Sequence, residues 1–446
     1  MLLDFTVGNY GCFADEALLS FVRPGLKTQT PRAGQSWQDV TYRVAAVYGA
    51  NASGKSTLLE ALTGLCWAVA HPGWSLFRPY ALKDGSDADP TVYDVNFTHD
   101  GVRYHYEVEA HAWGIGRESL HSYPHGARRH LFTRTQEEGG ELSVKTGTGM
   151  TGPTAEVRKV TTPRDLFLAS AHRYRHKTLA PIARGLRLGS AVRTVNHDEA
   201  ERMGRIQWMM ARMVEDPAHW EAMSNAVAHM ADLGVKRIEV REREIPPEAL
   251  DRIRSLVAVS GDEADEEISK EIPKEMLERM RRSLVFVHAG RDGGEYELGL
   301  GAQSEGTVTW LASVGPALDA LRSGRVLVVD ELDASLHPGL AAAMVELFKS
   351  GAYNTAGAQL LFTTHDTSLL GNSPTRLLDP GEVWFCEKDG EGASELVPLS
   401  DYDTRPGNNE QKRYLAGKFG AIPRVDLSRL LECGFSGDAA EMPEAS

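Results

Sequence analysis

The stretch Arg43-Val-Ala-Ala-Val-Tyr-Gly-Ala-Asn-Ala-Ser-Gly-Lys-Ser-Thr57 decides the fold of this chain. Residues 44–48 are a short, mostly apolar run that is typical of a buried parallel strand. Residues 49–56 fit the phosphate-binding loop pattern, in which four residues separate a glycine from Gly-Lys-Ser. Residues 57–69 then place leucines at helical spacing. The order strand, glycine loop and helix favours a phosphate site over an ordinary glycine turn.

The residue types of this loop suit ATP and Mg²⁺. Glycines at both ends permit positive φ and close approach of the backbone, so that successive N–H groups surround a phosphate. The N-terminus of the following helix points at the same phosphates. Lys55 supplies a positive charge to the β- and γ-phosphates, and the Ser56 hydroxyl is a Mg²⁺ ligand. The predicted nucleotide-binding residues here are Gly49, Asn51, Ala52, Ser53, Gly54, Lys55, Ser56 and Thr57.

A second pair of apolar runs ends in polar side chains. Residues 326–329 are followed by Asp330 and Glu331, and residues 359–364 are followed by His365. A helix predicted between the two runs makes a right-handed parallel crossover, so both carboxyl ends face the edge of the sheet that holds the phosphate loop. We assign Asp330 to Mg²⁺, Glu331 to orientation of the attacking water, and His365 to a hydrogen bond with the γ-phosphate or that water.

A third feature is the segment Gln303-Ser-Glu-Gly-Thr307, which precedes a helix predicted at residues 308–321. Ser304 suits an N-cap, and Gly306 allows the backbone to approach a ligand closely. This helix N-terminus is therefore a second predicted anion site. Because the phosphate loop already holds one end of a nucleotide, we expect Ser304 and Gly306 to address a nucleotide bound to another subunit.

Length and composition are those of a soluble protein. The 446 residues are enough for two or three domains, and 42% hydrophobic and 25% charged residues are ordinary for globular chains. There is no apolar run long enough for a bilayer and no signal peptide, and the four cysteines are too far apart for a zinc site. We therefore expect a cytoplasmic protein with reduced thiols and no membrane partner.

Charge limits the contact with nucleic acid to a local patch, because the net charge is −14. Residues 158–193 are the candidate: they hold nine Lys or Arg against the single acid Asp165, with His172 and Tyr174 among them. Charge runs are more often solvated faces, or here a phosphate-facing edge of the nucleotide site. We favour those two interpretations and leave a nucleic-acid or partner surface open.

The remaining patterns predict elements around this centre. Period-two alternation predicts two antiparallel strands within residues 1–22, a β-meander at 91–134 and a final hairpin at 381–400. Residues 196–282 show helical spacing instead, with a methionine-rich stripe that we interpret as core packing rather than a binding groove.

These motifs resemble the head of ABC-type ATPases, as found in chromosome-maintenance and break-repair ATPases and in OLD-type nucleases. The correspondences are residues 49–56 with Walker A, 326–331 with Walker B and its catalytic glutamate, 333–336 with the D-loop, and His365 with the switch histidine. Residues 303–307 are similar to the signature sequence, although Glu305 replaces its first glycine. We assign no Q-loop glutamine.

As a whole, the chain resembles the compact ABC-type, AAA-family ATPases of bacterial anti-phage defence operons, such as the ATPase subunit of the PARIS system. The resemblance implies an α/β fold of the P-loop NTPase type, with a mixed sheet, an antiparallel β-lobe and an inserted, mainly helical subdomain. The implied parts are an N-terminal ATPase lobe at 1–175, the helical insertion at 176–290, a C-terminal ATPase lobe at 291–400, and a tail at 401–446 suited to partner contact.

The resemblance also implies hydrolysis of ATP and a set of partners. One phosphate loop and one signature per chain mean that enclosed ATP needs a second copy, in a homodimer or larger oligomer. A separately encoded effector nuclease and a phage protein as trigger are the other implied partners. Two alternatives stay open: a DNA-repair or DNA-structure ATPase, and a nucleotide-bound scaffold that sequesters a toxin. A nuclease within this chain is disfavoured, because the segment after His365 has no cluster of metal-binding acids.

Overall fold

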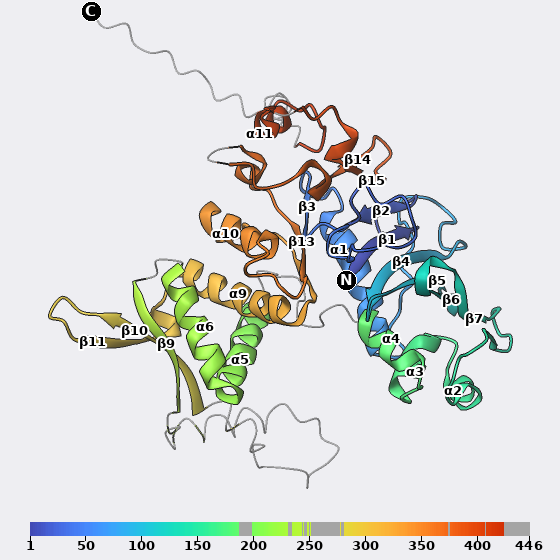
Figure 1. Cartoon of the computed structure of the whole chain (residues 1–446), viewed down its shortest axis with the longest axis horizontal. Helices are drawn as coiled ribbons and strands as arrows, with labels where there is room; N and C mark the ends of the chain where they lie inside the picture. The colour runs from blue at the N-terminus through green and yellow to red at the C-terminus, as the bar shows by residue number, and fades with distance from the viewer. Residues whose placement is uncertain are drawn as a thin grey trace, which may run out of the picture.

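The computed structural model describes residues 1–186, 199–230, 234–242, 281–372, 375–405 and 407–422, together with residues 244, 248, 250 and 277. Part of the predicted helical insertion and the end of the predicted tail, from residue 423, lie outside these described residues. Two large sheets and one small sheet, with helices packed on them, make up the described chain (Figure 1).

The phosphate-loop strand lies at the centre of a five-stranded sheet in the order β12-β13-β3-β14-β15. Four strands are parallel, and β15 closes one edge as an antiparallel partner of β14. The predicted crossover, the final hairpin and the mixed sheet of a P-loop fold are therefore confirmed. The bounds are β3 Val44–Tyr48, β12 Val326–Val329, β13 Gln359–Thr363, β14 Val383–Lys388 and β15 Ser394–Pro398.

Both faces of this sheet are covered. Alternate residues of β3 divide between two cores: Ala45 and Val47 pack toward α1, whereas Val44 and Ala46 pack toward α9, α10 and α11. A strand buried on both faces needs apolar residues at every position, so these strands appear in the sequence as continuous apolar runs. The helices span α1 Lys55–Ala70, α9 Glu305–Ser323, α10 Pro338–Lys349 and α11 Glu410–Leu415.

A seven-stranded antiparallel sheet lies on the other side of α1, in the order β2-β1-β4-β5-β6-β7-β8. The two predicted N-terminal strands and the β-meander are confirmed, and pairing of β1 with β4 joins them in one sheet. Its strands are β1 Leu2–Gly8, β2 Ala17–Ser20, β4 Thr91–His99, β5 Val102–His111, β6 Gly114–Tyr123, β7 Arg129–Thr135 and β8 Ser143–Thr146.

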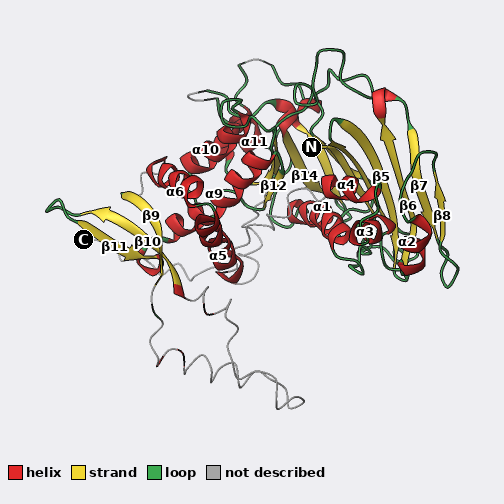
Figure 2. Cartoon of the chain, turned by 60° about the horizontal axis from the view of Figure 1, so that its bottom comes forward, coloured by secondary structure: helices red, strands yellow, loops and turns green. Residues whose placement is uncertain are grey.

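Helices cover one face of this antiparallel sheet (Figure 2). They are α1, α3 Phe167–Arg173 and α4 Leu179–Leu186, while α2 Thr154–Val160 packs beside α3. Side chains of these helices and of the inner sheet face form one continuous apolar core. Since α1 also packs on the parallel sheet, it is the layer that holds the two large sheets together.

The third layer contains α5 Glu199–Glu215, α6 Pro217–Met230 and a sheet in the order β11-β10-β9. Its strands are β9 Val235–Glu242, β10 Arg282–Ala289 and β11 Glu295–Gly299. Met209, Met210 and Met213 are buried here with α9, which confirms the methionine-rich stripe as core. The four-part domain division itself stays a prediction.

The prediction of helix throughout 196–282 is wrong at β9. Val235 and Ile238 are both buried and are three residues apart, as on a helix face. A register shift in the pairing of β9 with β10 falls between them and turns both side chains to the same face of an extended strand. The sequence alone does not distinguish this bulge from a helical turn.

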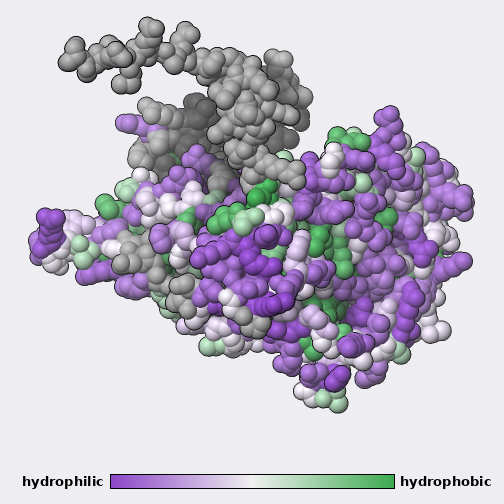
Figure 3. All heavy atoms as spheres, turned by 90° about the horizontal axis from the view of Figure 1, so that it is seen from above, coloured by the Kyte–Doolittle hydropathy of each residue, from purple (hydrophilic) through white to green (hydrophobic). Residues whose placement is uncertain are grey.

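None of the described helices is both long enough and apolar enough to cross a membrane. The face of the molecule seen in Figure 3 is largely hydrophilic, and hydrophobic residues gather along its middle. These observations agree with the composition, which contains 25% charged residues.

Gln359 fastens the two large sheets to each other. Its side chain is 1% exposed and lies at the start of β13. The amide oxygen accepts the Leu2 N–H at 2.7 Å, and the amide nitrogen donates to the Leu2 carbonyl at 2.8 Å. One glutamine therefore satisfies both backbone groups of Leu2, the first residue of β1, at the junction of the sheets.

Replacing Gln359 by leucine keeps the side-chain volume and removes both hydrogen bonds. A buried polar group left unpaired costs about 1–3 kcal/mol, so we expect Gln359→Leu to lower the free energy of unfolding by at least about 2 kcal/mol in a urea titration. The control Gln35→Leu changes an exposed glutamine and should shift it by less than about 0.5 kcal/mol. Equal losses in the two variants would contradict this role.

Candidate phosphate-binding site

The loop at residues 49–54 joins β3 to α1. The helix begins at Lys55, two residues before its predicted start, with Gly54 as N-cap at φ 111°. No side chain caps this end, and the first turn contains no acidic residue. The N–H groups of a first helical turn lack partners within the helix, so this end of α1 is open to an anion.

The two glycines of the loop serve different needs. Gly54 takes a positive φ, whereas Gly49 does not. What Gly49 requires is space, because a Cβ there would lie 2.3 Å from the carbonyl oxygen of Cys386 and 2.6 Å from Ser53 Oγ. Ala52 takes a positive φ instead, at 62°.

Lys55 lies over the loop that precedes it. Its side chain is 6% exposed, and Nζ donates to the carbonyl oxygens of Gly49 at 2.9 Å and Ala50 at 3.0 Å. Burial lowers the pKa of Lys55, while nearby groups that include Asp330 and Glu331 oppose this shift. The ammonium is thus held where the phosphates of P-loop proteins bind.

Ser53 is the clearest sign that the loop receives a ligand. The residue is 3% exposed, and its hydroxyl has no hydrogen-bond partner in the described part of the chain. A buried polar atom without a partner is rare in folded proteins and calls for an explanation such as a ligand. A phosphate oxygen fits this hydroxyl. The loop is also held from the sheet, since Ser394 Oγ and Cys386 Sγ both donate to the Ser53 carbonyl, at 2.7 and 3.1 Å.

The other predicted residues of this segment surround the loop. Asn51 and Ala52 are exposed, and Ser56 and Thr57, the second and third residues of α1, are partly buried. The Thr57 methyl group would lie 2.8 Å from a Cβ on Gly11, so the N-terminal loop after β1 packs against this end of the helix.

Asp330 and Glu331 directly follow β12. Thr363, the last residue of β13, donates its hydroxyl to Asp330 Oδ1 at 2.5 Å and accepts the Glu331 N–H at 2.7 Å. Asp330 is 6% exposed. Glu331 has φ 51°, a conformation that costs about 1–3 kcal/mol for a non-glycine residue and that clusters at functional sites.

His365 lies just beyond the end of β13. Its backbone N–H donates to Asp333 Oδ1 at 3.1 Å, and the same oxygen accepts the Thr364 hydroxyl at 2.6 Å. Partial desolvation of the ring, and then the Lys55 ammonium, lower the pKa of His365, against the opposing effect of three nearby carboxylates. A lowered pKa keeps the imidazole neutral at neutral pH, with one ring nitrogen able to accept a hydrogen bond from water.

Residues from distant parts of the sequence therefore meet at one edge. Pairing in the order β12-β13-β3 aligns the three carboxyl ends from which Asp330, His365 and the phosphate loop follow. The charges of Lys55 and Asp330 each act on the pKa of His365, so the three groups are electrostatic neighbours. The structure brings the predicted residues together, and their catalytic roles stay predictions.

Ser304 and Gly306 lie elsewhere, at the start of α9. Ser304 is its N-cap and accepts the Thr307 N–H at 3.2 Å, and the helix begins at Glu305, earlier than predicted. Within the described residues, the Ser304 hydroxyl bonds only to Thr307. A Cβ on Gly306 would lie 3.2 Å from the Ser335 carbonyl oxygen. The role of this helix end toward a nucleotide of another copy remains a prediction.

Sequence reasoning missed the residues that support the site. One feature of the sequence could have identified Thr363: it is a hydroxyl residue at the end of a strand that is predicted to lie beside residues 326–329. Ser394 and Cys386 carried none, because their contacts with the loop depend on the pairing of the final hairpin with β3. Burial raises the pKa of the Cys386 thiol to about 12, so the thiol stays protonated and able to donate.

One family model matches most of the chain. The family described as "AAA domain, putative AbiEii toxin, Type IV TA system" matches residues 44–144 and 156–371, which include the phosphate loop and the Asp330, Glu331 and His365 segment. No curated protein matches the chain.

Two solved structures are similar to the chain at low identity. The SMC head domain from Thermotoga maritima is 13% identical with a TM-score of 0.37, covering 89% of this chain and 98% of that one. An SMC head bound to the C-winged helix domain of ScpA is 11% identical with a TM-score of 0.38, covering 89% and 97%.

Replacing Gly49 by alanine tests the loop. The new methyl group would meet the Cys386 backbone at 2.3 Å, so the loop must shift. We expect the affinity for a fluorescent ATP analogue to fall at least about tenfold, because misplacement of a site by 1 Å costs about that or more. Gly25→Ala is the control, since nothing lies within 4 Å of a Cβ there. Unchanged affinity in Gly49→Ala would exclude this loop as the binding site.

Proposed function

The chain belongs to the family described as "AAA domain, putative AbiEii toxin, Type IV TA system", and on that premise we propose that it is an ATPase that hydrolyses ATP to ADP and phosphate between two copies of itself. ATP and Mg²⁺ are the ligands that such a phosphate loop implies. The buried, unpartnered Ser53 hydroxyl and the uncapped start of α1 fit the phosphates. The observation that carries the proposal is the meeting of Lys55, Asp330 and His365 at one sheet edge.

Each side chain has one task in this proposal. Lys55 and the N–H groups at the start of α1 bind and orient the triphosphate. Ser56 and Asp330 would hold Mg²⁺, which supplies charge neutralisation of the phosphates when bound. Glu331 orients the attacking water and takes its proton. His365, neutral because its pKa is lowered, accepts a hydrogen bond at the same place.

The proposal includes a second copy of the chain because one chain alone does not enclose the nucleotide. The chain has one phosphate loop and one Ser304–Gly306 segment, and the contacts of that segment are with Thr307 and Ser335 rather than with the loop. The start of α9 is a second helix end suited to an anion, and it does not contact the phosphate loop of its own chain. It is therefore suited to a nucleotide that the second copy binds. Two loops and two such helix ends then enclose two nucleotides in a symmetric dimer.

Glu331→Gln separates binding from hydrolysis. The variant keeps shape and hydrogen bonding but loses the base, so we expect hydrolysis to slow by about 10²–10⁴-fold while ATP still binds. ATP and Mg²⁺ should then accumulate a dimer or larger oligomer, measured by light scattering after size-exclusion chromatography. The control is Glu346→Gln, an exposed glutamate on α10.

The control should hydrolyse ATP at the wild-type rate. A Glu331→Gln variant that hydrolyses ATP normally would remove the assigned base. A variant that binds ATP, does not hydrolyse it and remains monomeric would remove the shared site while leaving the ATPase intact.

Thr363→Val tests the support of the carboxylates. Valine keeps the shape of threonine and removes the hydroxyl that bonds Asp330 and the Glu331 backbone. We expect single-turnover hydrolysis to slow by about 10²-fold, because the carboxylates lose their fixed positions, with little change in ATP affinity. Thr63→Val on the outer part of α1 is the control. If both variants hydrolyse ATP equally well, Thr363 does not position the site.

We further propose a regulatory role in anti-phage defence, with a separately encoded effector nuclease and a phage protein as trigger. The family description names a toxin–antitoxin system, which agrees with a partner encoded beside this chain. In the described residues, the one group with metal-ligand spacing is His105, Glu107 and His121 on the antiparallel sheet, not an acidic nuclease cluster. Copurification from the native operon would identify the partner.

A further inference from the structure

Four of the nine cations of the basic run line a pocket at the far end of α1, while Arg187 and Arg193 lie outside the described residues. The pocket has a volume of about 800 Å³ and is formed by the C-terminal end of α1 together with α3, α4 and the turn between them. Four cations line it, Arg173, Arg175, Lys177 and Arg184, along with three histidines and no acidic residue. The lining of this pocket is therefore strongly basic.

For these four cations, the location excludes one of the two favoured interpretations of the run. The pocket is lined by residues 70–72, whereas the phosphate loop precedes residue 55. A helix of 16 residues separates them. At a rise of 1.5 Å per residue that is about 24 Å. The cations are therefore not a phosphate-facing edge of the nucleotide site.

No acidic side chain among the residues that line the pocket neutralises its positive charge. Asp165, the one acid of the run, is 7% exposed, and its carboxylate accepts the Thr162 N–H at 2.8 Å. None of the four cations forms an ion pair with another described residue, and all four are exposed. Like charges gathered in one pocket repel each other, so the cluster costs stability unless an anion binds there.

Helix dipoles explain only part of the cluster. Arg173 and Arg184 lie in the last turns of α3 and α4, where a cation stabilises the helix end. Arg175 and Lys177 lie between the helices. Arg175 adopts φ 53° as the residue after the C-cap of α3, where its N–H donates to the His172 carbonyl oxygen at 3.1 Å and ends the helix.

Two exposed aromatic residues lie near the cations, outside the lining of the pocket itself. Tyr174 is 48% exposed, and the Arg173 guanidinium lies 5.9 Å from its ring centre. Trp74 is 50% exposed and lines a neighbouring hollow with Arg164. It packs edge-on against Trp67, which stacks on the pocket residue His71 with ring centres 3.7 Å apart. Basic side chains that follow a phosphate backbone, beside rings on which bases stack, are the elements of a single-strand binding surface.

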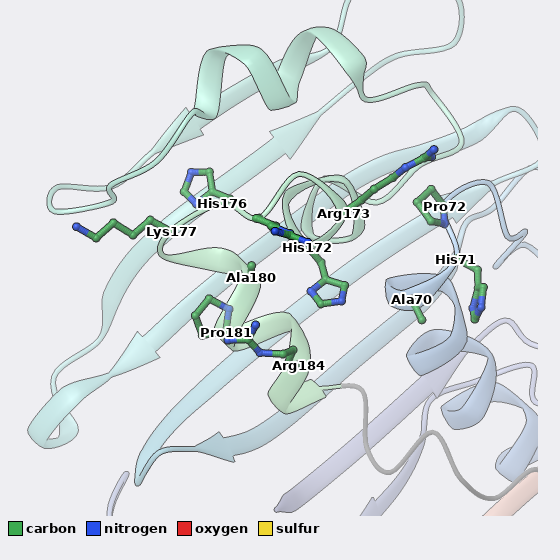
Figure 4. Close-up of a pocket in the computed structure, with 11 residues that line it drawn as sticks. Ala70, His71, Pro72, His172, Arg173, His176, Lys177, Ala180, Pro181 and Arg184 are labelled. Atoms are coloured by element: carbon green, nitrogen blue, oxygen red, sulfur yellow. The ribbon is translucent and has the colours of Figure 1, made fainter. Parts of the chain in front are cut away.

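We propose that this pocket binds a single strand of nucleic acid, with the backbone on Arg173, Arg175, Lys177 and Arg184 and bases against Tyr174 and Trp74. Figure 4 shows Arg173 and Lys177 extending to opposite sides of the pocket, with His172 and Arg184 between them. Charges spread in this way suit successive phosphates better than one compact ion. A concave pocket admits an unpaired nucleotide, whereas the convex backbone of a duplex does not enter it. The site lies apart from the proposed ATPase site and goes beyond that function.

The direct test is fluorescence anisotropy of labelled oligo-dT and oligo-U, about 20 nucleotides long, with the full chain at about 50 mM salt. We expect binding that weakens steeply with added salt. The double variant Arg173→Glu/Arg175→Glu should lower the affinity at least about tenfold and flatten the salt dependence. Tyr174→Ala should lower the affinity about fivefold or more, since one stacked base contributes that much.

The matched control is Lys145→Glu/Arg291→Glu, which makes the same charge change at exposed positions on β8 and in the turn between β10 and β11. The affinity of this control for the oligonucleotide should stay within about twofold of the wild type. Its two positions do not line the pocket, and salt screens exposed charges that lie more than a Debye length from the bound strand. All variants should keep the wild-type affinity for ATP, which reports an intact fold without requiring hydrolysis. If the double glutamate variant loses that affinity, Arg173→Gln/Arg175→Gln replaces it.

Competition identifies the ligand. Unlabelled single strands should displace the probe better than ATP, inorganic polyphosphate, duplex DNA or polyglutamate at equal charge. Equal displacement by polyglutamate with no effect of Tyr174→Ala would assign the surface to an acidic protein and overturn the proposal. Equal displacement by polyphosphate or duplex would overturn the single-strand assignment, and so would an absence of binding at low salt. None of these outcomes bears on ATP hydrolysis.

Discussion

The side-by-side pairing of β12, β13 and β3 is the constraint on which the rest of the structure depends. Parallel strands end at a common edge, so three polar segments that follow them in the sequence meet there whatever their distance along the chain. The observed register pairs Val326 with Gln359 and Leu360 with Val44, and it places the segments that follow these strands at one edge. The pairing of the strands in this sheet therefore determines which side chains meet at the site.

Local strain gathers where this edge meets the loop. In the described residues, Ala52, Glu331 and Ser335 all have positive φ although none is glycine. They occupy the phosphate loop, the end of β12 and the segment beside α9. Such conformations persist only where the surrounding structure holds them, and at Glu331 the backbone N–H donates to the Thr363 hydroxyl at 2.7 Å.

Helix α1 gives the molecule two electrostatically different ends. Its N-terminus, without an acid or a side-chain cap, faces the predicted phosphate site, and its C-terminus opens on the basic pocket. The helix dipole favours anions at the first end and cations at the second, so both ends agree with the direction of α1. One helix thereby separates the predicted nucleotide site from the basic pocket.

The sequence by itself determined the phosphate loop, its flanking strand and helix, and the carboxylates after β12. Residue type and the spacing of neighbouring residues are enough to identify each of them. Only the tertiary structure decided that Thr363, Ser394 and Cys386 support the site, that β9 is a bulged strand, and that four cations of the basic run lie at the far end of α1. These depend on pairings between segments that are up to hundreds of residues apart, and no local pattern records which strand becomes the neighbour of another.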